Sequence, residues 1–461
     1  MKNPKNLHVV VLAAGQGTRM YSATPKVLHQ LGGKPLLAHV IDKARQIDAA
    51  QIHVVHGHGG AQVCAAINDA TLHWVEQSRQ LGTGHALLQA IPAIHDDATV
   101  MVLYGDVPLI RSETLQTLLR VAEANTLALL TATLSNPTGY GRILRDHGGR
   151  VLRIVEEKDA TAEQRSITEI NTGILAATAR DLKNWLARLT NQNAQGEYYL
   201  TDVVGLAVSD GAAVLTAQPT TLEEILGVNN RQQLAHLERH YQRQRAHDLM
   251  LSGVTLRDPA RFDARGALRV GRDVTIDVDV IFEGEVDIAN DVSIGPFSFI
   301  RNCKIASGAT ILSHCVIEDA IIGPGTRVGP YARIRPGTTL DDGAHVGNFV
   351  EVKNARIGRN SKANHLSYVG DATVGNDVNI GAGTITCNYD GANKHHTYIE
   401  DNVFVGSDTQ LVAPVRVRRN ATIGAGTTVT KEVPEDVLVI SRVPQQIKTG
   451  WKRPTKKKPT I

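Results

Sequence analysis

The chain has 461 residues, a length that suits roughly two to four domains with sizeable cores. Its formal net charge is only +3, which is too small to indicate a nucleic-acid partner. Four cysteines without zinc-binding or redox spacing are typical of a reducing cytoplasm. The apolar run 9–14 is too short for a signal peptide or a membrane span, so we expect a cytoplasmic protein without a membrane span.

Residues 8–14 have the length and composition of a buried strand, and they lead directly into a glycine-rich turn. Gly15 and Gly17 in that turn would let backbone N–H groups approach phosphate oxygens closely. Arg19 and Lys26 follow, and both can bring positive charge to the same phosphates. The spacing matches neither the dinucleotide-binding fingerprint nor a Walker A loop, and a glycine-rich turn alone is also compatible with an ordinary β–α connection.

Further segments of the N-terminal half indicate a nucleotide and a metal ion. Gln77 and the small-residue loop 82–85 could let a flat base lie against the backbone. The apolar segment 100–105 ends at Asp106, and an aspartate at the carboxyl end of a parallel strand suits a Mg²⁺–phosphate site, although it could also cap a helix. Asn229 offers an amide oxygen as a second hard ligand. Loops that could hold sugar hydroxyls follow at 139–142, 156–158 and 169–173.

The C-terminal half repeats an aliphatic or aromatic residue at every sixth position over long stretches. No α-helix has this period, and a six-residue repeat predicts a parallel β-helix in which three hexads form one coil of about 18 residues. We expect the left-handed form, with the repeated side chains buried in one column. The series comprises Ile276, Phe282, Ile288, Ile294, Ile300, Ile322, Val328, Ile334, Leu340, Val346, Val352, Val405, Leu411, Val417, Ile423 and Val429.

Polar residues interrupt this repeat and favour a catalytic β-helix over a purely structural or regulatory one. Arg335, Lys353 and Lys394 are candidate phosphate partners. His365 is a candidate general base, and Glu351 could orient it and stabilise its charged form. A single histidine is more often structural, but a histidine near a carboxylate and several cations favours catalysis.

The order of these motifs along nearly the whole chain resembles a known family. The run from Leu12 to Lys26 is similar to the signature of the sugar-phosphate nucleotidyltransferases. The stretches 384–391 (Thr-Ile-Thr-Cys-Asn-Tyr-Asp-Gly) and 440–444 (Ile-Ser-Arg-Val-Pro) resemble the bacterial family of bifunctional N-acetylglucosamine-1-phosphate uridyltransferase / glucosamine-1-phosphate N-acetyltransferases. The resemblance implies an α/β nucleotidyltransferase (Rossmann-like) domain followed by a left-handed parallel β-helix of hexapeptide repeats.

The resemblance also implies a division of labour. A uridyltransferase domain would span 1–229, a helical linker 230–252, an acetyltransferase β-helix 253–438 and a basic tail 439–461. The β-helix would acetylate glucosamine-1-phosphate from acetyl-CoA. The first domain would then transfer a uridylyl group from UTP, with Mg²⁺ as cofactor, to give UDP-N-acetylglucosamine and pyrophosphate. A homotrimer assembled through the β-helix is implied, with acetyl-transfer sites shared between subunits. The basic tail is either solvated or a clamp for a phosphorylated ligand.

For the first domain the family pattern assigns residues to the phosphates, the base, the metal ion and the sugar. Phosphates would be held by Gly15, Gly17, Arg19 and Lys26, uracil by Gln77, Gly82 and Thr83, Mg²⁺ by Asp106 and Asn229, and the acetamido sugar by Gly141, Glu156 and Asn171, while Leu12, Ala13, Tyr104 and Gly105 would also contact the nucleotide sugar. Arg19 and Lys26 would act catalytically through the charge that they bring. Gln16 stands where some members carry lysine, so these two cations must supply that charge.

For acetyl transfer, the resemblance implies that His365 takes a proton as the 2-amino group of the sugar attacks the thioester. The acceptor would be bound by Arg335, Lys353, Tyr368, Asn379 and Lys394, and acetyl-CoA would be contacted by Ala382, Asn388, Tyr389, Ser407, Ala425 and Arg442.

Three rival functions are compatible with parts of this pattern. A monofunctional pyrophosphorylase would use its β-helix only for effectors or assembly, and would lack an organised polar cluster on the coils. A non-catalytic exchange factor or scaffold would show erosion of the 15–26 loop, which is intact. A β-helix carbonic anhydrase would need three histidine ligands for Zn²⁺; His345 and His365 lie about one coil apart, but nothing in the sequence indicates a third.

Overall fold

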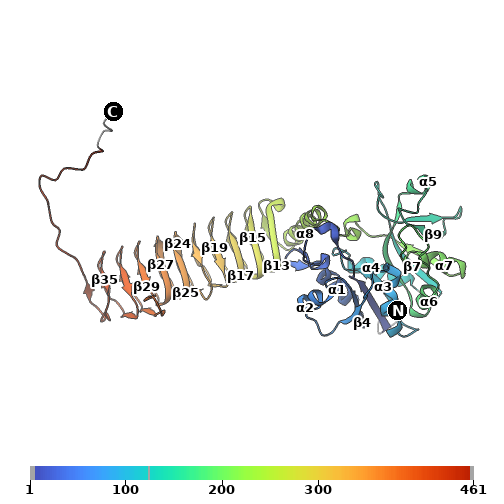
Figure 1. The fold of residues 1–461 in the computed structure, drawn as a ribbon. Coiled ribbons are helices and arrows are strands. Elements are labelled where there is room, and N and C mark those ends of the chain that lie inside the picture. Colours follow the sequence, from blue (N-terminus) through green and yellow to red (C-terminus); the bar gives the residue numbers. More distant parts are fainter. Residues whose placement is uncertain (1–5, 123–124, 457–461) are drawn as a thin grey trace, which may run out of the picture. The chain divides into compact units, whose positions relative to one another are not determined.

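The computed structural model describes residues 6–122 and 125–456, which form two compact units (Figure 1). The units comprise residues 1–245 and 246–461, so the division falls inside helix α8 (Arg231–Leu251). The helix coincides with the predicted linker. Among the described helices, none combines the length and apolarity needed to cross a bilayer.

The first unit is built on a nine-stranded mixed sheet with β1 at its centre. β1 pairs in parallel with β4 on one side and with β6 on the other, whereas β10 runs antiparallel to its neighbours. Across the sheet the strands are β11 (Ala213–Ala217), β7 (Thr126–Thr133), β10 (Glu169–Thr178), β6 (Thr99–Tyr104), β1 (Leu7–Leu12), β4 (Gln51–His56) and β5 (His73–Glu76), with β8 (Arg142–Arg145) and β9 (Val151–Val155) as a hairpin beside β10 and the small pair β2 (Gln30–Leu31) and β3 (Lys34–Pro35) apart.

Helices cover both faces of this sheet, and each face has its own core. Val9 and Val11 of β1 pack into one core and Val10 into the other, which explains why the predicted strand is apolar at every position. The first core includes residues of α1 (Leu36–Gln46), α2 (Gly60–Ile67) and α4 (Ser112–Val121), and the second includes residues of α3 (Thr83–Ala90), α6 (Ala179–Leu186) and α7 (Asp202–Ser209). The short helix α5 (Ala162–Arg165) follows β9.

The strand order creates a crevice at the carboxyl ends of β1 and β6. β4 and β6 leave β1 on opposite sides, and ligands of open α/β sheets bind where the strand order reverses in this way. Leu12 pairs with Tyr104, and the Gly105 N–H donates to the Leu12 carbonyl oxygen at 3.0 Å. The glycine-rich loop after β1 therefore begins beside the loop that carries Asp106.

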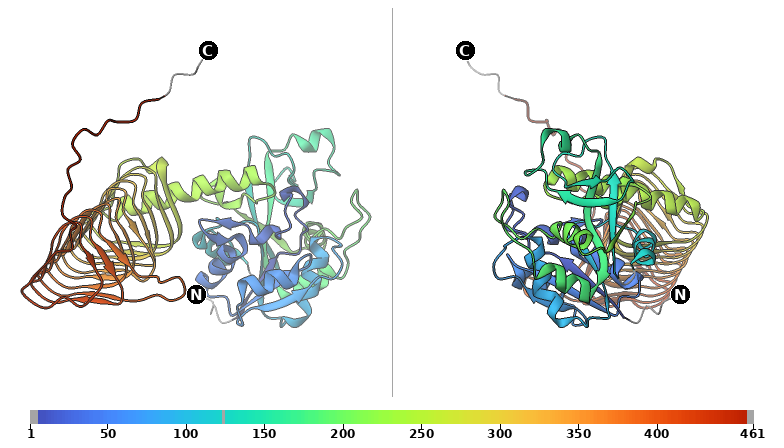
Figure 2. Two further views of the ribbon diagram at one scale, coloured as in Figure 1. Left: turned by 60° about the vertical axis from the view of Figure 1, so that its left-hand side comes forward. Right: turned by 90° about the vertical axis from the view of Figure 1, so that its right-hand side faces the viewer.

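The second unit is a parallel β-helix whose stacked coils are visible in Figure 2. Ile276 pairs with Ile294, 18 positions further along, as expected for coils of three hexads. One sheet contains β12 (Thr255–Leu256), β14 (Thr275–Ile276), β16 (Ser293–Ile294), β18 (Thr310–Ile311), β21 (Arg327–Val328), β24 (His345–Asn348), β26 (Lys362–His365), β28 (Asn379–Ile380), β31 (Phe404–Val405), β34 (Thr422–Ile423) and β36 (Leu438–Val439). The other contains β13 (Phe262–Val270), β15 (Val280–Ile288), β17 (Phe299–Ile305), β19 (Val316–Glu318), β22 (Arg333–Ile334), β25 (Glu351–Ile357), β27 (Tyr368–Val374), β29 (Ile385–Cys387), β32 (Gln410–Val412) and β35 (Thr428–Val429), with β20 (Ile321–Ile322), β23 (Thr339–Leu340), β30 (Thr397–Ile399) and β33 (Val415–Val417) as branches.

The interior of the coils is the predicted aliphatic column. Every residue of the six-residue series is buried in one continuous core. Cys303 and Cys315 lie in the same core, and burial raises the pKa of each thiol to about 11. These cysteines are therefore small apolar core residues and not reactive thiols.

One corner of the β-helix carries large exposed side chains where the backbone favours glycine. Phe297, His314, Tyr331 and Phe349 have φ between 55° and 61°, and their rings follow one another at centroid distances of 5.0, 4.6 and 5.4 Å. Leu366 continues the row with φ 35°. Such a conformation costs a non-glycine residue about 1–2 kcal/mol. At most other described corners of the coils, asparagine, aspartate or glycine occupies this conformation. We call this row of five residues the aromatic ridge.

Three histidines stand side by side on neighbouring strands of the first unit. His8 Nδ1 lies 3.1 Å from His53 Nε2, and the His53 ring lies 5.1 Å from that of His73. Burial lowers the pKa of His53 to about 4, and the neighbouring His8 and His73 contribute to the shift. Burial also lowers the pKa of His8. Both buried rings are therefore neutral at neutral pH.

We expect acid to destabilise the first unit through this group. The folded-state pKa of His53 is about 4 and its ordinary value is 6.5, so the unfolded chain takes up the proton first as the pH falls. The stabilising contribution of the neutral His53 ring is complete at pH values above 6.5. It is lost as the pH falls towards about 4, the pKa of His53 in the folded chain. Denaturant unfolding from about pH 7 to about pH 5 should show a shallower loss for His53→Gln than for the parent. The exposed His147→Gln is the control, and equal slopes for His53→Gln and the parent would contradict this assignment.

Candidate functional site

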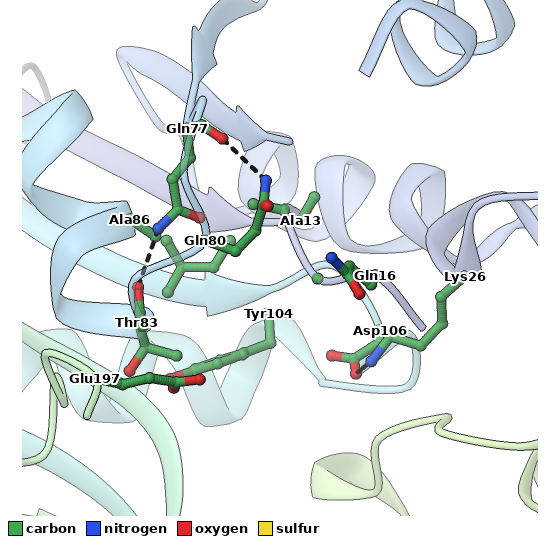
Figure 3. A pocket seen from close by; sticks show the side chains of 14 residues that line it. Ala13, Gln16, Lys26, Gln77, Gln80, Thr83, Ala86, Tyr104, Asp106 and Glu197 are labelled. Carbon is green, nitrogen blue, oxygen red and sulfur yellow. Dashed lines mark hydrogen bonds and ion pairs between the residues drawn. The ribbon is translucent and has the colours of Figure 1, made fainter. Parts of the chain in front are cut away.

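A cavity of about 560 Å³ opens at the carboxyl ends of β1 and β6 (Figure 3). It gathers nine of the residues predicted to bind the nucleotide, its sugar or the metal: Leu12, Ala13, Gly15, Lys26, Gln77, Gly82, Thr83, Tyr104 and Asp106. The sequence motifs did not single out four further lining residues as ligands, namely Ala14, Gln80, Ala86 and Glu197, while Gln16 also lines the cavity. Glu197 follows no motif, so only the folded chain could place it here.

The glycine-rich loop is shaped by the side chain of Lys26. Gly17 has φ 64°, and a Cβ atom at this position would lie 2.6 Å from the Cβ of Lys26. A side chain at Gly17 would therefore displace the lysine from the cavity. Gly15 faces open space. The two glycines thus have different roles, one admitting the lysine and the other leaving room for a ligand.

Two oxygen ligands and two cations meet at the mouth of this loop. The Lys26 ammonium forms an ion pair with Asp106 and lies 3.4 Å from Asn229 Oδ1. Arg19 Nη2 donates to the same Asn229 oxygen at 3.0 Å. A carboxylate oxygen and an amide oxygen thus converge on one positive group, the donor set that suits a hard cation such as Mg²⁺. The lysine ammonium stands in for such an ion here.

The predicted base-binding end of the cavity is rigid because its polar side chains are already paired. Gln77 is buried, and its Nε2 donates to the Gly82 carbonyl oxygen at 3.1 Å. Gly82 has φ 108°, and a Cβ atom there would lie 2.6 Å from the Tyr198 carbonyl oxygen. Thr83 begins α3, and its hydroxyl accepts a hydrogen bond from the Leu200 N–H. The predicted base-reading residues therefore form one preorganised wall.

The predicted sugar-binding residues lie around Tyr104, next to the main cavity. The Asn171 N–H donates to the Gly141 carbonyl oxygen at 2.8 Å, and Glu156 Oε1 accepts from the Thr201 hydroxyl at 2.9 Å. Burial raises the pKa of Glu156. Burial also raises the pKa of the Tyr104 phenol, and the nearby Glu156 and Asp106 carboxylates raise it further. Tyr104 thus connects the phosphate end with the candidate sugar end.

A second group of polar residues lies on the coils of the β-helix. Arg335 Nη1 donates to Glu351 Oε1 at 2.8 Å, and Glu351 pairs with Tyr368 on the next coil. The Lys353 ammonium lowers the pKa of Lys394, because two like charges stand close together. Two adjacent lysines with an arginine and a phenol nearby make a suitable binding site for a phosphate group.

The partner of His365 differs from the prediction. His365 Nδ1 lies 2.9 Å from Asn348 Oδ1, whereas the Glu351 carboxylate is engaged by Arg335. The reason is the register of the coils, which places Asn348 directly beside His365. The expected carboxylate–histidine pair is therefore wrong, and an amide takes the place of the carboxylate. Because an amide oxygen can only accept, the Nδ1–H group is the donor in this contact, and Nε2 is then the acceptor atom of the neutral ring.

Of two further predicted ligands, Asn388 has hydrogen-bond partners that favour a structural role, and Asn379 lies on a different sheet from Lys353. The Asn388 side chain donates to the buried Asp371 at 2.5 Å and lies 3.4 Å from the Tyr368 hydroxyl. It therefore supports Tyr368, one of the residues predicted to bind the acetyl acceptor. Asn379 belongs to the other sheet of the β-helix from Lys353. Asp371 has no sequence motif of its own; its position one coil before Asn388 was the only available signal.

The remaining predicted acetyl-CoA residues form a column along one corner. The Asp408 N–H donates to the Ala382 carbonyl oxygen, and the Gly426 N–H donates to that of Ser407. Arg442 Nε donates to the Ala425 carbonyl oxygen at 3.0 Å. Ala382, Ser407 and Ala425 thus follow one another on successive coils, with a cation at the end. Tyr389 is exposed in a separate loop.

No group of three His, Cys, Asp or Glu side chains in residues 6–122 and 125–456 is arranged as a metal site. The pair of Asp106 and Asn229 falls below that number, so the finding leaves it open to a metal ion that also uses phosphate oxygens.

Three family models match the chain. The model of the MobA-like NTP transferase domain covers residues 9–250, that of the GMPPB C-terminal domain 264–357, and that of the bacterial transferase hexapeptide (six repeats) 396–431. Together with the mixed sheet and the parallel coils, these matches confirm the predicted fold, an α/β nucleotidyltransferase domain followed by a left-handed parallel β-helix.

Two curated proteins named bifunctional protein GlmU are similar to the chain over nearly its whole length. The one from Methylococcus capsulatus is 58% identical over 448 residues, which are 97% of this chain and 97% of that protein. The one from Aromatoleum aromaticum is 59% identical over 452 residues, which are 98% of this chain and 99% of that protein.

Replacement of Lys26 should weaken anion binding in the main cavity. We expect Lys26→Ala to lower the affinity for inorganic pyrophosphate at least about tenfold, or roughly 1.4 kcal/mol, because the ammonium group of a mostly buried side chain is lost. Isothermal titration calorimetry measures this directly. Lys34→Ala is the matched control, since Lys34 pairs with Asp42 away from the cavity. Equal affinities for Lys26→Ala and Lys34→Ala would exclude Lys26 from the anion site.

Proposed function

The chain belongs to the GlmU family of bifunctional enzymes, and we propose the residues with which it carries out each of the two reactions. It transfers an acetyl group from acetyl-CoA to glucosamine-1-phosphate and a uridylyl group from UTP to the product, giving UDP-N-acetylglucosamine and pyrophosphate. The match over almost the whole chain rules out the monofunctional, scaffold and carbonic anhydrase alternatives as readings of the entire protein. The division of domains at residues 229, 252 and 438 is part of the proposal.

For uridylyl transfer, the observation that carries the assignment is the cavity between β1 and β6. The sugar phosphate oxygen attacks the α-phosphorus of UTP in line, and pyrophosphate leaves. Arg19 and Lys26 neutralise the charge on the phosphates, and the rigid wall at Gln77 orients the base. A bound Mg²⁺ would supply further neutralisation of the phosphate charge. Asp106 and Asn229 would hold this ion once Lys26 has turned towards the phosphates.

For acetyl transfer, the assignment depends on the tautomer of His365. Asn348 fixes the proton on Nδ1, so Nε2 is free to take a proton from the amino group of the acceptor. The amine nitrogen forms a bond to the thioester carbonyl carbon, the carbon–sulfur bond breaks, and the CoA thiolate takes up the proton that Nε2 accepted from the amine. Lys353 and Lys394 hold the acceptor phosphate, with Arg335 and Tyr368 beside them. The corner column ending at Arg442 would bind acetyl-CoA.

We propose that the active form is a homotrimer assembled through the β-helix. The exposed aromatic ridge supports this, because backbone strain along an exposed row of rings needs a compensating contact. A cytoplasmic location is also proposed; in the described part of the chain all four thiols are unpaired.

Two substitutions should separate the activities. Asp106→Ala removes a proposed ligand of the Mg²⁺ ion, so we expect uridylyl transfer to fall by roughly 10²–10³-fold while acetyl transfer is kept. His365→Ala removes the base, so acetyl transfer should fall by roughly 10²–10⁴-fold while uridylyl transfer is kept. Product formation from glucosamine-1-phosphate, acetyl-CoA, UTP and Mg²⁺ can be followed by mass spectrometry. Loss of both activities in either folded variant would refute the two-site model.

A charge placed on the aromatic ridge should break the assembly. Phe349 is 58% exposed in the single chain, so Phe349→Asp should leave the coils intact but prevent copies from packing there. We expect sedimentation velocity to show a monomer that has lost acetyl transfer and kept uridylyl transfer. Tyr398→Asp, at another exposed ring away from the ridge, should remain trimeric. A trimeric Phe349→Asp would place the contact elsewhere.

A further inference from the structure

The loop 388–395, which carries Lys394, is closed by its own acidic side chain. Asp390 Oδ1 accepts hydrogen bonds from the backbone N–H groups of Ala392 at 2.8 Å and Asn393 at 2.7 Å. Asp390 Oδ2 lies 2.6 Å from His395 Nε2. The Asn393 N–H and then the His395 imidazole hold the pKa of Asp390 well below its usual range. The carboxylate is therefore charged at neutral pH and binds three groups of one short loop.

His395 also closes the base of the loop through its backbone. Its N–H donates to the Asn388 carbonyl oxygen at 2.8 Å, and Tyr389 forms an antiparallel bridge with Lys394. Asn388 is in turn anchored to the buried Asp371. His395 thus connects the tip of the loop, through Asp390, with the end that is fixed to the β-helix.

Lys394 needs such support because it faces another cation. Lys353 stands close enough to lower the pKa of Lys394, and the Asp371 carboxylate opposes this shift only in part. Two neighbouring ammonium groups repel each other when no anion lies between them. A lysine on an untied loop would move away from its neighbour into solvent, so the loop itself must hold it in place.

We propose that the His395–Asp390 pair is a positioning device that holds Lys394 beside Lys353, so that the two ammonium groups clamp the phosphate of the acetyl acceptor. The inference rests on the proposed acetyl transfer and extends it to two residues outside the predicted site. His395 does not contact the reacting atoms and acts only through Lys394. The device matters for phosphate recognition and leaves the chemical step at His365 unchanged.

The test compares two acceptors and three variants. In His395→Ala we expect the KM for glucosamine-1-phosphate to rise at least about tenfold with little change in kcat. Glucosamine lacks the phosphate, so its kcat/KM should equal that of the parent. His395→Gln can still donate to Asp390 and should restore most of the affinity. His396→Ala is the matched control, because the neighbouring His396 lies 2.9 Å from the Thr373 hydroxyl and its ring packs at an angle against Tyr398 instead.

Several outcomes would overturn the proposal. An unchanged KM for glucosamine-1-phosphate in His395→Ala would show that the His395–Asp390 pair is not needed for binding of the acceptor. An equal loss with glucosamine would assign His395 a general structural role. Uridylyl transfer in the same samples reports on the integrity of the chain. If the parent acetylates neither acceptor, the proposed acetyl transfer itself fails. The role of His395 in phosphate binding is then tested by calorimetry, with glucosamine-1-phosphate as the ligand. Equal affinities in the parent and His395→Ala would overturn the proposal.

Discussion

The hydrogen bonds between successive coils are the constraint from which the β-helix site is built. Parallel pairing stacks each residue on one that lies one coil further along the chain. Asn348 therefore meets His365, and Glu351 meets Tyr368, although neither pair is close in sequence. The buried aliphatic column sets the register of the coils, and the outward-facing side chains follow the same register. The core therefore determines which polar side chains lie next to one another.

The nucleotide site depends on a different use of parallel pairing. There the register of Leu12 with Tyr104 brings two loops together at the carboxyl ends of neighbouring strands. One loop contributes backbone and the cation of Lys26, and the other contributes the carboxylate of Asp106. In both units a lysine is the candidate phosphate partner, but its surroundings balance its charge differently. Lys26 is balanced by a carboxylate, whereas Lys394 is opposed by a second lysine.

The sequence allowed the architecture to be predicted because both folds leave periodic or contiguous signals. The six-residue series marks the buried column, and the run before Gly15 marks the central strand. The sequence also indicated which residues gather in the nucleotide cavity, since loops at strand ends converge. It did not reveal the partner of His365, because a carboxylate nearby in sequence is less informative than the coil register that selects Asn348. Glu197 and Asp371 were not predicted as site residues either, because tertiary contacts alone bring them to their sites.

The loop 388–395 lies outside the stacking period of the coils, between β29 and β30. Its internal hydrogen bonds and its anchor at Asn388 make it a separate module on a repetitive scaffold. Changes in its length or sequence would leave the hydrogen-bond ladder of the coils untouched. The scaffold therefore offers a route to altered acceptor preference, in which a redesigned stretch 390–395 exchanges the proposed phosphate clamp for contacts to another substituent, while the proposed base and the candidate acetyl-CoA residues Asn388 and Tyr389 stay in place.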